Sequence, residues 1–142
     1  MIKIITILHV LGASVWVGGH LILLLRFLPQ ALREKNPGII LAFEKKYEPI
    51  GVPALLLQVI TGIILGYHYQ ISLFSFKNQF DITFNLKLIL LLMTILFGVH
   101  ARFFLIPKLN EKNLNSLAYH ILAVTLLSIG FVYLGISFRT GY

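Results

Sequence analysis

The stretch IITILHVLGASVWVGGHLILLLRFL, residues 4–28, decides the fold class, because it holds no charged residue before Arg26. A helix rises about 1.5 Å per residue, so roughly 20 apolar residues cross the ~30 Å hydrocarbon core of a bilayer. The stretch is longer than the apolar part of a signal peptide and has no small-x-small cleavage site. We therefore expect it to be retained as a membrane helix.

Three further stretches have the same apolar character and a similar length: residues 50–69, 83–106 and 115–138. Pro29 and Pro107 are expected to end the first and third helices, because proline lacks the N–H group that would continue a helix. Asp81 is the expected N-cap of the third helix. The sequence therefore predicts an all-α fold, an integral membrane antiparallel four-helix bundle that forms one transmembrane domain over residues 1–142.

The composition agrees with this class. The chain is 58% hydrophobic and 12% charged, which leaves no room for a soluble domain beside the four spans. The net charge of +7 therefore fits lipid head groups and topology signals, and we expect no nucleic-acid partner. The chain has no cysteine, which excludes disulfides, thiolate metal sites, iron–sulfur clusters and covalently attached c-type haem.

Basic residues are divided unequally between the two ends of the predicted bundle. The end with the first and third connections holds eight of them: Arg26, Arg33, Lys35, Lys45, Lys46, Arg102, Lys108 and Lys112. The end with both termini holds four: Lys3, Lys77, Lys87 and Arg139. The positive-inside rule then predicts a bacterial-type inner-membrane protein with both termini outside the cytoplasm. Residues 29–49 form the first connection and mix charges, a pattern compatible with a short interfacial helix.

All five histidines fall within or at the edge of a predicted span: His9, His20, His68, His100 and His120. An ionisable group in lipid is costly, so it usually faces the interior of the bundle and has a function. A membrane histidine also serves simply to bond a neighbouring helix. Five histidines with almost no buried carboxylates to pair with them favour a functional set.

His9 and His20 share one face of the first helix. They are eleven positions apart, which at 100° per residue leaves them about 20° from eclipsed and about 16.5 Å apart along the axis. Trp16 lies between them on the same face, beside small residues that let a flat macrocycle or another helix come close. Trp16 is therefore part of the candidate cofactor site.

The antiparallel order sorts the histidines into two levels. His9 and His68 lie toward the end with the termini, and His20, His100 and His120 lie toward the other end. Two levels predict two haem b groups, one on His9 and His68 and one on His20 with His100, or with His120 as the alternative ligand. Copper is the alternative cofactor, because imidazole also binds copper and three histidines share one level.

Two basic residues complete the candidate site. Lys87 lies six positions into the third span, counted from Asp81, at about the depth of His9. It would serve as counter-ion to a haem propionate or a substrate carboxylate, unless its long stem carries the charge to the interface. Arg102 would do the same at the opposite end.

Short motifs over residues 8–100 resemble two families, the HemJ-type protoporphyrinogen oxidases and the CopD copper-resistance membrane domain. The first-helix motif reads Leu8-His9-Val10-Leu11-Gly12, then Trp16-Val17-Gly18-Gly19, then Leu28-Pro29. The second reads Phe43-Glu44-Lys45-Lys46-Tyr47, then Pro53 and Thr61-Gly62. Lys87 and His100 resemble positions of the third segment.

The resemblance implies a small four-helix membrane protein in which His9, Trp16 and Lys87 are the key HemJ-type positions. It implies either protoporphyrinogen oxidation in haem biosynthesis or copper handling. The chain has His20-Leu21-Ile22 where HemJ-type proteins carry Tyr-Leu-Pro-Arg. That difference favours the CopD-like side of the resemblance.

We therefore expect a b-type haem protein that works in electron transfer or as a haem-dependent oxidoreductase on a membrane-accessible substrate. The cofactor would carry the chemistry, and the protein would bind and insulate it. The expected partners are the lipid bilayer and a redox partner, or a quinone or porphyrin-like substrate, and a homo-oligomer is left open. A CopD-like copper-handling protein and a HemJ-type oxidase are the alternatives.

Overall fold

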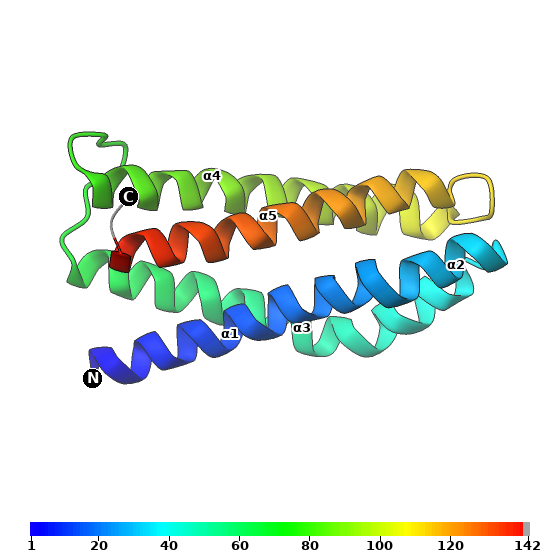
Figure 1. The fold of residues 1–142 in the computed structure, drawn as a ribbon, viewed down its shortest axis with the longest axis horizontal. Helices are drawn as coiled ribbons and strands as arrows, with labels where there is room; N and C mark the ends of the chain where they lie inside the picture. The colour runs from blue at the N-terminus through cyan, green and yellow to red at the C-terminus, as the bar shows by residue number, and fades with distance from the viewer. Residues whose placement is uncertain (141–142) are drawn as a thin grey trace.

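The computed structural model describes residues 1–140, apart from the side chain of Arg139, and in these residues it has helices and no strands. The elements in chain order are α1 (Ile2–Ile22), η1 (Leu23–Phe27), α2 (Leu28–Glu34), α3 (Gly38–His68), α4 (Gln79–His100), η2 (Ala101–Leu105), η3 (Ile106–Lys108) and α5 (Leu114–Thr140). They join into four long rods that run antiparallel (Figure 1).

The rods pack as two pairs. α1 lies mainly along α3 and α4 mainly along α5, and α5 also contacts α1 (Figure 1). The N-terminus, the end of α5 and the connection 69–78 lie at one end of the bundle, here called the terminal end. The turns 35–37 and 109–113 lie at the other, here called the turn end. This arrangement confirms the predicted all-α four-helix bundle.

Each rod is long and apolar enough to cross a bilayer: Ile2–Glu34, Gly38–His68, Gln79–Lys108 and Leu114–Phe138. At most 33% of the most apolar window of any rod is buried inside the bundle. The larger part of the apolar surface therefore faces outward, where only lipid would cover it favourably. The chain is a multi-pass membrane protein.

The first rod does not end at Pro29, which corrects the sequence prediction. Leu23–Phe27 form a π-helix, and Pro29 stands in the first turn of α2, which continues to Glu34. A proline at the start of a helical segment needs no N–H partner, and the wider π turns before it change the carbonyl positions its ring would meet. The rod ends instead at Lys35, which takes the left-handed conformation with φ 49°.

The expected connection 29–49 is also much shorter than predicted. Its second half forms the first turns of α3, which begins at Gly38 and runs through Pro49 and Pro53. A separate interfacial helix is therefore absent from this part of the chain. Ile40 near the start of α3 is fully buried in the apolar core. Burial of this side chain stabilises the segment as a packed helix.

The third rod begins earlier than predicted and ends close to where it was expected. Asn78 is the N-cap of α4, and its side-chain oxygen accepts the N–H of Asp81 at 2.8 Å. Asp81, the predicted cap, accepts the backbone N–H of Ser72 at 3.0 Å and so holds the connection 69–78. The π-helix η2 and the short η3 then close the rod one residue past Pro107.

The apolar core lies at the turn end, where α2, α3 and α5 meet. Its buried members are Leu23, Leu28, Ala31, Ile40, Leu114, Leu117 and Ile121. Buried polar side chains such as Thr61, Thr94 and Ser128 lie along the middle and toward the terminal end. The interior is therefore apolar at the turn end and more polar toward the terminal end, where His9 and Lys87 lie.

Candidate functional site

The ring of His9 on α1 is oriented by α3. Its Nδ1 lies 2.8 Å from Oγ1 of Thr61, and that hydroxyl donates its own proton to the carbonyl of Leu57 over 2.5 Å. The hydroxyl therefore acts as acceptor toward His9, and Nδ1 carries the ring proton. The Gln58 amide donates to the His9 backbone carbonyl and fixes α1 against α3 at the same level. Neutral His9 thus keeps its lone pair on Nε2, the nitrogen that would bind a metal.

Lys87 on α4 directs its ammonium into the bundle instead of toward water. Nζ lies 4.6 Å from the centre of the Phe138 ring on α5 and faces Gly135, where an added Cβ would lie 3.9 Å away. Among the described residues no carboxylate pairs with it. A cation–π contact offsets part of the cost of burying a cation, and a paired carboxylate would offset much more.

His9 and Lys87 lie toward the same end of the bundle. His9 is in the first half of α1 and Lys87 in the first half of α4, both toward the terminal end, and both side chains are partly buried. They come from α1 and α4, with Thr61 from α3 and Phe138 from α5. All four rods therefore contribute side chains to this end of the bundle, which holds an imidazole lone pair and a cation that no carboxylate of the described residues pairs with.

A second cluster lies about two turns further along α1. The Trp16 and His20 ring centroids are 4.4 Å apart, and His20 meets Tyr47 of α3 edge-on at 5.9 Å. Tyr47 donates its hydroxyl to the carbonyls of Val15 and Trp16 at 3.2 Å each. The buried Nε1–H of Trp16 has no hydrogen-bond partner among the described residues. The cluster joins α1 to α3 and leaves one buried donor free, which is uncommon in native structures.

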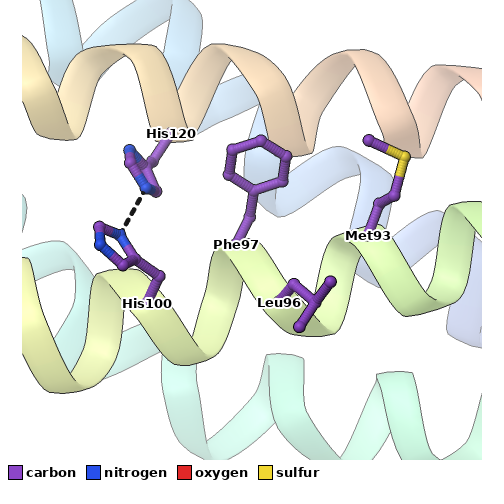
Figure 2. Close-up of a pocket in the computed structure, with 5 residues that line it drawn as sticks. All are labelled: Met93, Leu96, Phe97, His100 and His120. Atoms are coloured by element: carbon purple, nitrogen blue, oxygen red, sulfur yellow. Dashed lines mark hydrogen bonds between the residues drawn. The ribbon is translucent and has the colours of Figure 1, made fainter.

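His100 and His120 form a third cluster, between α4 and α5 (Figure 2). Nδ1 of His100 lies 2.8 Å from Nε2 of His120, and the two rings are nearly parallel with centroids 4.9 Å apart. His100 is exposed on the outer face of the bundle. Met93, Leu96 and Phe97 continue from the pair along α4 and line a groove of about 270 Å³ (Figure 2).

Neither of the predicted histidine pairs is brought together. His68 is exposed at the end of α3, where its ring contacts Tyr69. It lies about 10 Å along the helix from Thr61, the residue that holds His9. His20 contacts Trp16 and Tyr47, whereas His100 contacts His120.

The three histidines predicted at one level do not form a metal-ligand set. Among the described residues no three His, Cys, Asp or Glu side chains converge on one point. Arg102 forms an ion pair with Glu48 of α3 at 3.1 Å, which ties η2 to α3. It is therefore already engaged by a carboxylate of the chain itself.

Sequence reasoning gave no role to two residues that shape these clusters, although both belong to the motifs that carry the family resemblance. Thr61 sets the tautomer of His9, and Tyr47 bonds α1 to α3. Neither residue reveals its partner in the sequence, because the partner lies far away along the chain. Comparison with family models, with curated proteins and with solved structures found no match for this chain.

Proposed function

We propose that the protein binds haem b within the membrane, where His9 would ligate the iron and Lys87 would pair with a propionate, and that it works in electron transfer or in oxidation of a membrane-accessible substrate. The observation that carries this proposal is that His9 and a lysine with no carboxylate partner among the described residues both lie in the interior toward the terminal end. A metal tetrapyrrole with carboxylate side chains matches both groups at once.

The chain's own residues would do the following. Thr61 keeps the proton on Nδ1 of His9 and leaves Nε2 for iron. Lys87 neutralises a propionate, and Phe138 limits the access of water to that ion pair. When bound, haem supplies one-electron chemistry that these side chains lack. One haem on one histidine fits the observed geometry better than two haems on histidine pairs, because His68 lies about 10 Å further along α3 than Thr61, which bonds His9.

Copper handling is the weaker alternative at this site. A copper ion bound at His9 would bring a further positive charge to the end of the bundle that holds Lys87, whereas haem brings its own negative charges. A HemJ-type activity remains compatible, because a porphyrinogen carries the same carboxylates as haem. The proposal therefore covers a tetrapyrrole as cofactor or as substrate at the same pair of residues.

The test is the haem content of the detergent-purified protein, read from absorption spectra before and after reduction. We expect His9→Ala to lose the haem and His68→Ala, a matched change at an exposed histidine, to keep it. Lys87→Met should weaken haem retention about tenfold or more, the size of a lost charge-assisted hydrogen bond. Full haem content in His9→Ala would refute the proposal.

We also propose that the turn end faces the cytoplasm of a bacterial-type cell and that both termini lie outside. The support is the distribution of Lys and Arg, eight of which lie in the two turns or in the parts of the rods toward the turn end. In this orientation the His9–Lys87 site lies in the outer half of the membrane and the His100–His120 pair in the inner half.

A further inference from the structure

The apolar runs of the first three rods are shorter than the rods themselves. Residues 4–25, 49–68 and 82–101 hold a single Lys, Arg, Asp or Glu between them, which is Lys87. Each run has about the 20 residues that cross the ~30 Å hydrocarbon core of a bilayer. The rods that contain these runs have 33, 31 and 30 residues, which corresponds to roughly 45–50 Å. Part of each rod therefore extends beyond the hydrocarbon.

The surplus length lies mainly at the turn end, where the three runs stop at a similar level. Exposed basic residues mark this level, and we call them the basic ring: Arg26, Lys45, Lys46 and Arg102. They lie roughly 10 Å short of the ends of their rods at the turn end. Arg102 pairs with Glu48, and the other three form no ion pair among the described residues. With Glu44 and Glu48, four basic and two acidic side chains leave an excess of two positive charges.

Beyond the basic ring the bundle packs as a protein in water does. The apolar core has five buried members on the turn side of the ring: Leu28, Ala31, Ile40, Leu114 and Leu117. Burial of apolar side chains stabilises a fold strongly where water surrounds it, whereas lipid tails are as apolar as the side chains. The position of the core therefore indicates that the turn end stands in water.

Hydrocarbon that reached the turns would enclose the basic ring. Lys45 and Lys46, both exposed on α3, would then lie roughly 10 Å inside it, and Glu48, whose side chain is 40% exposed, would lie deeper. Exposed charges at that depth are strongly unfavourable. Tyr119 is 73% exposed on α5 near the level of the ring, which suits the membrane–water interface, where tyrosine is enriched.

We propose that the basic ring binds the phosphate groups of anionic phospholipids, and that residues 27–42 and 103–118 beyond it form a cap folded in water. A lipid phosphate matches the ring in charge and in depth, and it accepts charge-assisted hydrogen bonds from lysine and arginine. This placement depends neither on haem nor on which side of the membrane the turn end faces.

The first experiment locates the edge of the hydrocarbon. The chain has no cysteine, so a single introduced cysteine can be labelled cleanly with a water-soluble maleimide in nanodiscs, which leave both membrane faces open. Ala42→Cys and Leu56→Cys are both at exposed positions of α3, on opposite sides of the basic ring. With rates normalised to the denatured protein, we expect Ala42→Cys to react about tenfold faster or more. Protection of both cysteines would overturn the proposal, because the hydrocarbon would then reach the turns.

The second experiment tests the phosphates with two matched double variants. Lys45→Gln/Lys46→Gln removes two charges from the basic ring, and Lys35→Gln/Lys112→Gln removes two from the turns. The apparent unfolding temperature is measured in nanodiscs of phosphatidylcholine, with and without phosphatidylglycerol. We expect phosphatidylglycerol to raise it for the natural protein and high salt to cancel the rise. The ring variant should lose most of this rise, and the turn variant should keep it.

Three results of the second experiment would overturn the binding of phosphates by the ring. These are no rise with phosphatidylglycerol in the natural protein, an equal loss in the two double variants, and a loss confined to the turn variant. The last result would place the phosphates at the turns and would agree with a protected Ala42→Cys. Circular dichroism of both variants confirms that each is folded before the comparison.

Discussion

At the residue scale, the chemistry of the candidate sites depends on which ring nitrogen carries the proton. A hydroxyl or a carbonyl accepts from Nδ1 in His9, His20 and His120. In each case the neighbour leaves Nε2 as the acceptor of the neutral ring. For His9 the neighbour is Thr61 of another helix, so this orientation depends on the packing of α1 against α3.

Thr61 should therefore affect haem binding without touching the haem. Thr61→Val keeps the shape but removes the acceptor for Nδ1–H, and we expect haem affinity to fall about tenfold to a hundredfold, as for other groups that orient a metal-binding histidine. Thr61→Ser keeps a hydroxyl and is the control. Haem titration of the purified variants checks this, and equal affinities for the valine and serine variants would contradict it.

Trp16 should contribute to stability through its ring and not through its N–H group. Trp16→Ala opens a cavity between α1 and α3, which we expect to cost about 3–5 kcal/mol. Trp16→Phe keeps an aromatic ring and removes a buried donor that has no partner among the described residues, so it should cost clearly less. Unfolding in mixed detergent measures both. Equal losses would show that Nε1–H donates to a bound group that the bare chain lacks.

At the element scale, the two helix hairpins use the same local devices. In each hairpin, the first of the two rods has a π-helix near its end, and a proline follows it, at Pro29 and at Pro107. A similar five-residue run follows each proline and leads into or through the turn. The two runs are Leu32-Arg33-Glu34-Lys35-Asn36 and Leu109-Asn110-Glu111-Lys112-Asn113. Similar local sequences thus end both rods near the same level of the membrane.

Close packing of α1 on α3 depends on a glycine. The Tyr47 ring lies directly against Gly19, where an added Cβ would overlap the ring. Gly19→Ala should therefore destabilise the protein by about 1–3 kcal/mol, as overpacking does. Gly18→Ala is the matched control, because nothing lies within 4 Å of a Cβ there, and it should be neutral or slightly stabilising. Similar unfolding curves for the two variants would show that the α1–α3 interface does not hold Tyr47 in this position.

At the scale of the whole molecule, the bundle separates two kinds of interior. The apolar core at the turn end is held by Leu23, Ile40 and Leu117, which are almost fully buried. Toward the terminal end, the interior includes His9 and Lys87, which add no comparable apolar packing. We infer that the turn end supplies much of the packing energy and that the terminal end holds the candidate site around His9 and Lys87.

The orientation of the molecule in the membrane is tested with fusions. A reporter active only outside the cytoplasm, joined to the C-terminus, should be active, and the same reporter inserted in the turn 109–113 should be inactive. The reason is the excess of Lys and Arg at the turn end. The opposite pattern would invert the placement of both sites relative to the cell and would leave the bundle itself unchanged.

The sequence by itself determined the membrane class, the four spans and the antiparallel bundle. Those features follow from the length and apolar character of each stretch, which the thickness of a bilayer constrains directly. The ends of the rods were harder to predict, because a π-helix before Pro29 and burial of Ile40 override the local effect of proline and of charged residues.

Only the tertiary structure decided which histidine meets which partner. Sequence places a residue along a helix to about one turn, roughly 5 Å, whereas a hydrogen bond or a metal ligand requires a few tenths of an ångström. The rotation of each helix about its axis is set by contacts between helices, such as Tyr47 against Gly19. For that reason His9 meets Thr61, and His100 meets His120, although the sequence predicted other pairs from depth alone.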